Sequence, residues 1–355
     1  MQPYQPNQPS LLSPTLSQAI QAARSWVAEN AADKPGYLGA YIGGSAPTLS
    51  PEDRLPAGSD TDVYLVTSDP TPPPKPGKLI HQGVLLEISF VSWQQLFPPE
   101  RSLSNYHLAN SLRYCCTIDD PEGRLAPLQQ QVANQFSSLV FLAARRDQAI
   151  ERVYSGLTGI RYDRSLPDLV LSWLFPMGIT AHAILTAAQK NPTVRLRYLR
   201  AREVMQANGM EQAYQQMLSF PGLDLITPEL AGQLLDRLEP LYDLAARIGH
   251  TPLPYSTDIS PLSRFTAIQA SRTLIAEGAH REITFWTLTT YARAMKVLLT
   301  DAPDGYRQYL PCFEQALQSV GRLEQPAVQQ AVTDALAFLP RLRQLTDRLI
   351  NLPAE

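Results

Sequence analysis

The chain is poor in the residues that build zinc centres and disulfide frameworks. Its 355 residues include three cysteines and five histidines. Cys115 and Cys116 are neighbours and cannot form an ordinary disulfide with each other, and no Cys-x-x-Cys pair or His-rich spacing is typical of a zinc site. We therefore predict that these thiols and Cys312 are free, in a reducing compartment.

A strong net charge and a secretory signal are also missing. The formal net charge is −3, so the chain has no general basic field and a long nucleic acid is not expected as a partner. The first nine residues, MQPYQPNQP, lack the cationic start and the apolar core of a signal peptide. We predict a disordered lead-in over residues 1–12 and a cytoplasmic location.

One segment lacks charged residues for about the length of a membrane span. Leu169 to Ala188 contains no Asp, Glu, Lys or Arg, and a spanning helix needs roughly 20 residues. Polar residues dilute this segment, and Pro176, followed by Met177 and Gly178, is expected to break or kink a helix at its middle. We expect two buried helical pieces of a soluble core and no membrane.

What the sequence does contain is a change of pattern along the chain. Its length is sufficient for two domains. Before about residue 129, short apolar runs bounded by Gly and Pro accompany helical segments. The elements expected there are a helix over 13–30, strands over 37–42, 60–67, 84–91 and 112–118, and a short helix over 93–97 that begins after Ser92. After about residue 129, apolar residues recur in long segments at 3.6-residue spacing.

These patterns predict an α+β fold. We expect residues 13–128 to form a domain with a small mixed β-sheet flanked by helices, and residues 129–355 to form an all-α helical bundle. The proline-rich segment 70–77 cannot be a helix or a central strand. We interpret it as a stiff surface loop, with a polyproline-type interaction site as the alternative.

Three carboxylates give the strongest indication of chemistry. Asp60 and Asp62 are two residues apart, so both side chains leave the same face of a strand. Carboxylates that converge repel each other unless a cation lies between them, and Mg²⁺ prefers such oxygen ligands, completed by substrate phosphates. Glu87 lies within the apolar run 84–91, where a charge is costly without a partner. We therefore predict that its strand neighbours that of the two aspartates.

A small-residue turn precedes the acids. Gly43 and Gly44 allow close approach of a ligand to the main chain, and Ser45 offers an N–H and a hydroxyl to a phosphate if it opens a helical turn. We expect Gly43, Gly44 and Ser45, together with Ser59 beside the first aspartate, to contact a nucleotide.

This arrangement resembles the DNA polymerase β-like nucleotidyltransferase superfamily. The family signature is an apolar residue, Gly, Gly or Ser, a loop, Asp-x-Asp and a later acid on a neighbouring strand. Those places are filled here by Ile42, Gly44, Ser45, Asp60, Asp62 and Glu87. The small size and the helical second part are closest in kind to the aminoglycoside (kanamycin and streptomycin) nucleotidyltransferases. The loop between Ser45 and Asp60 is a few residues longer than is common in the family.

The resemblance implies an enzyme that uses two Mg²⁺ ions. Asp60, Asp62 and Glu87 would be catalytic residues and metal ligands, and a nucleoside monophosphate, most simply AMP from ATP, would pass to a hydroxyl of a small molecule with release of pyrophosphate. Glu87 would act as metal ligand, as general base, or as both. Two alternatives stay open: adenylylation of a protein partner, and a catalytically inactive nucleotide-binding module.

Two further groups are weaker candidates for ligand contacts. His81, just before the strand that carries Glu87, is interpreted as an exposed loop histidine, with a phosphate contact as the alternative. The densest basic cluster, Arg195, Arg197, Arg200 and Arg202, is interpreted as a solvated helix face, with a contact to a nucleotide or an acidic substrate as the alternative.

Overall fold

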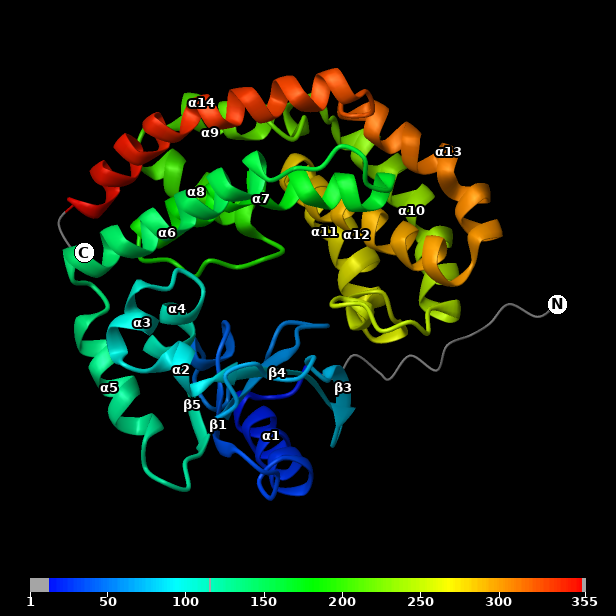
Figure 1. Ribbon diagram of the computed structural model, residues 1–355. Helices are drawn as coiled ribbons and strands as arrows, with labels where there is room; N and C mark the ends of the chain where they lie inside the picture. Colours follow the sequence, from blue (N-terminus) through cyan, green and yellow to red (C-terminus); the bar gives the residue numbers. More distant parts are fainter. Residues whose placement is uncertain (1–12, 115, 353–355) are drawn as a thin grey trace. The chain divides into compact units, whose positions relative to one another are not determined.

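The computed structural model describes residues 13–114 and 116–352, and it is an α+β protein (Figure 1). Its described residues form two compact units. The first comprises the described residues up to Phe141 together with Pro261–Ser263, and the second comprises the rest. The predicted lead-in over residues 1–12 and Cys115 lie outside the described residues.

The first unit contains a five-stranded mixed sheet with the strand order β3-β4-β2-β1-β5. The strands are β1 (Tyr37–Ile42), β2 (Thr61–Thr67), β3 (Gly77–His81), β4 (Val84–Ser92) and β5 (Cys116–Asp119). β2 and β4 run parallel, and the other neighbours run antiparallel. The predicted mixed sheet is therefore confirmed, and the two strands that carry the acids are direct neighbours.

Helix α1 (Leu16–Asn30) covers one face of this sheet. Thr15 and Gln18 form a capping box at its first turn, which satisfies N–H groups that a helix start leaves unpaired. The alternation of the strands places the apolar side chains Ala40, Ile42, Val63, Leu65, Leu86 and Ile88 against α1 in one core cluster.

Short helices pack against the opposite face. They are α2 (Trp93–Leu96), α3 (Pro99–Ser104), α4 (Leu108–Arg113) and α5 (Leu125–Gln135). The core on this face contains Tyr41, Val66 and Val91 from the strands together with Leu112 and Leu128 from the helices. As predicted, Ser92 caps the first of these helices, in a capping box with Gln95.

Two predicted elements of the sheet differ from the structure. The predicted strand over 112–118 is wrong in its first half, where α4 continues to Arg113 and the strand begins only at Cys116. The strand β3 was not predicted, because Gly77 ends a proline-rich segment and only five residues precede the turn at Gln82-Gly83. A short edge strand of this kind has little hydrophobic periodicity for a sequence pattern to detect.

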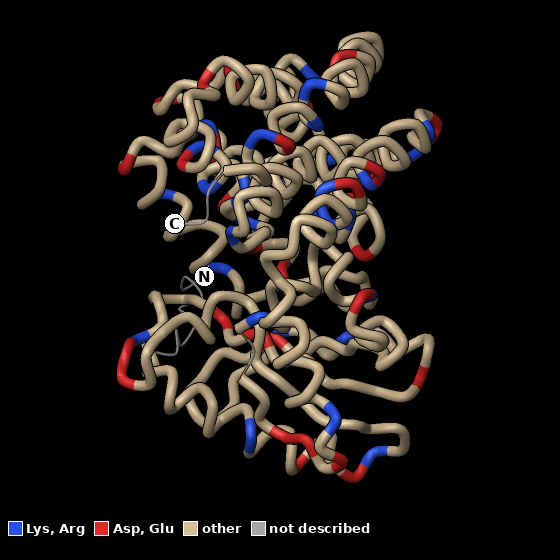
Figure 2. The backbone as a smooth tube through the Cα atoms, turned by 90° about the vertical axis from the view of Figure 1, so that its left-hand side faces the viewer, with Lys and Arg blue, Asp and Glu red and all other residues tan. Residues whose placement is uncertain are grey.

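The second unit is helical in its described residues. Its helices are α6 (Leu139–Thr158, which begins three residues before the unit), α7 (Leu166–Ala187), α8 (Arg197–Ala207), α9 (Glu211–Ser219), α10 (Pro228–Ile248), α11 (Ala270–Ala276), α12 (His280–Asp301), α13 (Pro303–Ser319) and α14 (Gln325–Ile350). The one-turn π-helix Phe265–Gln269 leads into α11. Residues of both charge signs are interspersed along both units (Figure 2).

Helix α7 is continuous, so the predicted break at Pro176 is wrong. Proline removes one backbone hydrogen bond, and here the surrounding packing retains the helix through that position. Gly156 of α6 lies against the proline ring, and a Cβ atom at Gly156 would lie 2.6 Å from Cγ of Pro176. Among the described helices α7 alone is long and apolar enough to span a membrane, and 72% of its apolar window is buried inside the protein.

Candidate metal and nucleotide site

The three predicted acids lie on the two neighbouring central strands, Asp60 and Asp62 at the start of β2 and Glu87 within β4. In the parallel pair β2–β4, Asp62 lies directly opposite Glu87. Asp60 immediately precedes β2 and, two residues before Asp62, shares its face. This face is opposite to the one covered by α1, because Val63 and Ile88 point into the core beneath that helix.

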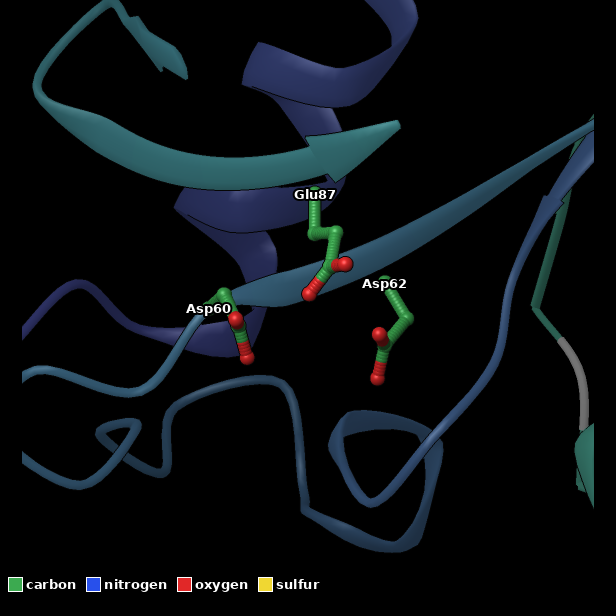
Figure 3. A group of neighbouring side chains, drawn as sticks. All are labelled: Asp60, Asp62 and Glu87. Carbon is green, nitrogen blue, oxygen red and sulfur yellow. The ribbon is translucent and has the colours of Figure 1, made fainter. Parts of the chain in front are cut away.

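The three carboxylates converge on one point (Figure 3). Each offers one oxygen such that all three oxygens lie within 4.8 Å of one another. The side chains are partly exposed, with 27% of Asp60 and 16% of Glu87 accessible. The predicted grouping of residues from two distant parts of the chain is therefore present, in a geometry that can hold a divalent cation.

Two lysines lie against these carboxylates. Lys78 of β3 is paired directly across the sheet with Glu87, and its Nζ lies 2.9 Å from Oδ2 of Asp60 and 3.8 Å from Oε2 of Glu87. Nζ of Lys75 donates a hydrogen bond to Oε1 of Glu87. Two ammonium groups therefore lie beside the carboxylates of Asp60 and Glu87.

The electrostatics of the cluster separate the three acids. Burial, followed by the charges of Asp60 and Glu87, raises the pKa of Asp62 to about 8. Burial and the charge of Asp60 also raise the pKa of Glu87. For Asp60 burial acts in the same direction, but the charge and hydrogen bond of Lys78 outweigh it and lower the pKa of this carboxyl. The two lysines therefore do not fully compensate the negative charge of the three carboxylates.

The glycine turn fits tightly beside the acids. The Gly43 N–H donates to the backbone carbonyl of Asp62 at 3.0 Å, so this donor is used within the sheet. Gly44 has a φ of +68°, and a Cβ atom there would lie 2.0 Å from Oδ2 of Asp62. Only glycine therefore allows the turn to approach this carboxylate so closely.

The two predicted serines, Ser45 and Ser59, lie close in sequence to the glycine turn and to Asp60, respectively. Ser45 is exposed and begins the 3₁₀ turn Ala46–Thr48, as its interpretation as the start of a helical turn requires. Its side chain makes no capping hydrogen bond to that turn. Ser59 is partly exposed, and its hydroxyl donates to the backbone carbonyl of Asp60 at 3.4 Å.

His81 is not part of this site, and its interpretation as an exposed loop residue is also wrong. It ends β3, only 18% of its side chain is exposed, and its Nε2 lies 3.1 Å from Oγ of Ser25 in α1. The alternation of the strand therefore turns it to the α1 face, away from the carboxylates.

The basic cluster in the second unit is likewise not a uniformly solvated face. Arg197 is 2% exposed, and its guanidinium lies 4.7 Å from the ring centroid of Phe285. Arg202 pairs with the buried Glu282 at 3.2 Å, whereas Arg200 pairs with Glu203 on the surface. Two of these arginines are thus structural elements of the helical core.

The sequence reasoning missed Lys75 and Lys78. The signal available was the spacing Lys-Pro-Gly-Lys directly before an apolar pair, Leu79-Ile80. Because β3 was not predicted, nothing placed Lys78 on the strand next to Glu87, or Lys75 in the segment that leads into that strand.

No protein-family model and no curated protein matches the sequence. Among solved structures, the chain is similar to a nucleotidyltransferase-like protein from Exiguobacterium sibiricum 255-15, with 12% identity and a TM-score of 0.30 over 82% of this chain and 91% of that chain. A similarity at this level carries no functional information. Any functional proposal must therefore come from the side-chain geometry described above.

Proposed function

We propose that the protein is a nucleotidyltransferase that moves a nucleoside monophosphate, most simply AMP from ATP, onto a hydroxyl group of a small molecule and releases pyrophosphate. The observation that carries this proposal is the position of Asp62 opposite Glu87 on parallel strands, with Asp60 beside them and all three oxygens within 4.8 Å. The turn at Gly44, in direct contact with the same carboxylate, adds support.

The donor set suits divalent cations, and we infer that it holds two Mg²⁺ ions. All three donors are carboxylate oxygens, which Mg²⁺ prefers. Burial, followed by the charges of Asp60 and Glu87, raises the pKa of Asp62, and a bound cation would offset this cost of its charged form. When bound, two such ions lower the pKa of an attacking hydroxyl and stabilise the leaving oxygen of an in-line displacement.

The chain's own residues would divide the remaining work. Asp60, Asp62 and Glu87 would hold the cations, and Glu87 is in addition the candidate base for the acceptor hydroxyl. Gly44 and Ser45, with Gly43 shaping the turn and Ser59 bordering the acids, would position the triphosphate. Positioning and charge neutralisation supply most of the rate in phosphoryl transfer.

The test is Mg²⁺-dependent release of pyrophosphate. The protein is incubated with ATP labelled on the α-phosphate, a panel of hydroxyl-bearing small molecules including aminoglycosides, and Mg²⁺ or EDTA. We expect label to appear in a small-molecule product only with Mg²⁺. Asp60→Asn and Asp62→Asn should lose the transfer, whereas Asp163→Asn, an exposed acid in the second unit, should retain it.

Each alternative gives a different result. Label in a protein band rather than in a small molecule would indicate adenylylation of a protein partner. Binding of ATP and Mg²⁺ without pyrophosphate release on any acceptor would indicate a nucleotide-binding module. Wild-type transfer rates in both aspartate variants would show that the acids are not the catalytic residues.

A further inference from the structure

The lysines of the acid cluster occupy space that a metal ion needs. Nζ of Lys78 lies 2.9 Å from Asp60 and 3.8 Å from Glu87, so one ammonium group lies between two of the three carboxylates. Lys75 binds the other oxygen of Glu87. Both oxygens of Glu87 thus face an ammonium group, and a cation that takes Glu87 as a ligand must compete with a lysine.

The backbone holds both lysines in place. Lys78 lies within β3, directly opposite Glu87 in the antiparallel ladder, and 11% of its side chain is exposed. Lys75 stands between Pro74 and Pro76, which restrict the backbone around it. The strand pairing therefore positions Lys78 beside Glu87, and the restricted backbone limits where Lys75 can lie.

The charges of the cluster indicate when divalent cations can replace the two lysines. When all five groups are ionised, three carboxylates and two ammonium groups leave one excess negative charge. Two divalent cations alone would make the site strongly positive, which is unfavourable at such short distances. A triphosphate carries about four negative charges near neutral pH, so two cations that enter together with it leave the balance unchanged.

We propose that Lys78, assisted by Lys75, is a built-in counter-ion that couples metal binding to triphosphate binding. Divalent ions displace the ammonium group of Lys78 from Asp60 and Glu87 only when a triphosphate arrives to receive it. Lys78 then contacts the phosphate oxygens and becomes a positioning residue for the nucleotide. This inference rests on the proposed function, because it needs the three acids to be metal ligands.

The coupling is measurable without turnover. Binding of Mn²⁺ to the full chain is measured by titration calorimetry, with and without the non-hydrolysable analogue α,β-methylene-ATP. In the wild type we expect the analogue to tighten Mn²⁺ binding by about a hundredfold, and by linkage Mn²⁺ must tighten analogue binding by the same factor.

Lys78→Met removes the counter-ion and keeps the aliphatic stem. In this variant we expect Mn²⁺ alone to bind about tenfold more tightly, the analogue to bind about tenfold more weakly, and the coupling factor to fall below about tenfold. Lys75→Met should shift the same quantities less, because of the three acids Lys75 pairs with Glu87, whereas Lys78 pairs with both Asp60 and Glu87. Lys34→Met, an exposed lysine of the same unit, is the matched control and should change nothing.

The outcomes separate this inference from the proposed function. If Asp62→Asn binds Mn²⁺ and the analogue as the wild type does, the proposed function fails, and the inference fails with it. If the acids are required but Lys78→Met leaves metal affinity unchanged or weaker, the inference alone is overturned. Should Lys78→Met not fold, Lys78→Gln removes the same charge while it retains a donor for Asp60, and the same shifts are expected.

Discussion

Two sets of acids, one in each unit, are arranged in opposite ways. In the helical unit, two partly buried acids each have a cation as partner: Asp168 pairs with Lys296 at 2.6 Å, and Asp258 pairs with Arg293 at 2.8 Å. In the unit with the sheet, three acids share two lysines, and one of these acids has a pKa of about 8. The first arrangement is balanced, and the second is not.

This contrast indicates which charges have a structural role. An acid with its own partner keeps its charged form in the folded protein, as the lowered pKa of Asp168 indicates: burial opposes the charge, but the hydrogen bonds from Lys296 and Ser165 outweigh it. An acid raised to about 8 is destabilised as an anion, and folding alone gives no reason to place it there. Such a group identifies a functional site when a geometric reason accompanies it.

The largest expected effect comes from exchanging one acid in each unit. Asp62→Asn should lower the rate of nucleotide transfer by at least about a hundredfold, because one ligand of the metal site is lost, while the fold is retained. Asp168→Asn should leave transfer unchanged and lower stability slightly. Transfer rates and thermal unfolding of both variants make this comparison, and an equal loss of activity in both would contradict it.

The second expected effect concerns the glycine turn. Gly44 and Gly123 have nearly the same positive φ, +68° and +65°, but a Cβ atom clashes with Asp62 at Gly44 and meets nothing within 4 Å at Gly123. Gly123→Ala should therefore cost about 1 kcal/mol of stability from backbone strain alone. Gly44→Ala should cost more and lower transfer by about tenfold to a hundredfold, because Asp62 must move.

Denaturant unfolding and transfer rates of the two alanine variants separate strain from displacement. Equal losses of stability, with full activity in Gly44→Ala, would show that the position of Asp62 beside the turn does not matter.

Much of the fold was predictable because the pattern of the central strands is strong. The apolar runs of β1 and β4 and the alternation of β2 gave strand positions within one or two residues of those observed, and Ser92 marked the helix that follows. The elements that were missed are short or governed by packing. β3 has five residues at a sheet edge, and α7 continues through Pro176 because Gly156 lets the neighbouring helix accommodate the ring.

The candidate site was predictable in its acids but not in its cations. Spacing places Asp60 and Asp62 on one face, and an acid in an apolar run requires a partner, which led to Glu87. Lys78 reaches the site only through the cross-strand pairing of β3 with β4, a long-range fact that local spacing does not encode. The pairing of residues across strands could therefore not be predicted from the sequence.

The smallest expected effect is a difference in how the two acids depend on pH in metal-free protein. A folded-state pKa of about 8 for Asp62, against about 3.9 in the unfolded chain, means that its ionisation destabilises the fold progressively as pH rises from about 4 to 8. Asp62→Asn removes this cost. In EDTA its stability relative to wild type should therefore increase between pH 5 and pH 8, by on the order of 1–3 kcal/mol.

Ionisation of Asp168 has the opposite effect on stability, and the same experiment tests it. Its lowered pKa contributes stability that is present above the unfolded pKa and is lost only as pH falls through the folded value. Because both values lie below pH 5, Asp168→Asn should cost a constant amount from pH 5 to 8, about 0.5 kcal/mol after solvent screening. Thermal unfolding at four pH values distinguishes a rising difference from a flat one. A flat profile for Asp62→Asn would mean that the two lysines already balance the cluster, and that the contrast between the units is one of geometry rather than of charge.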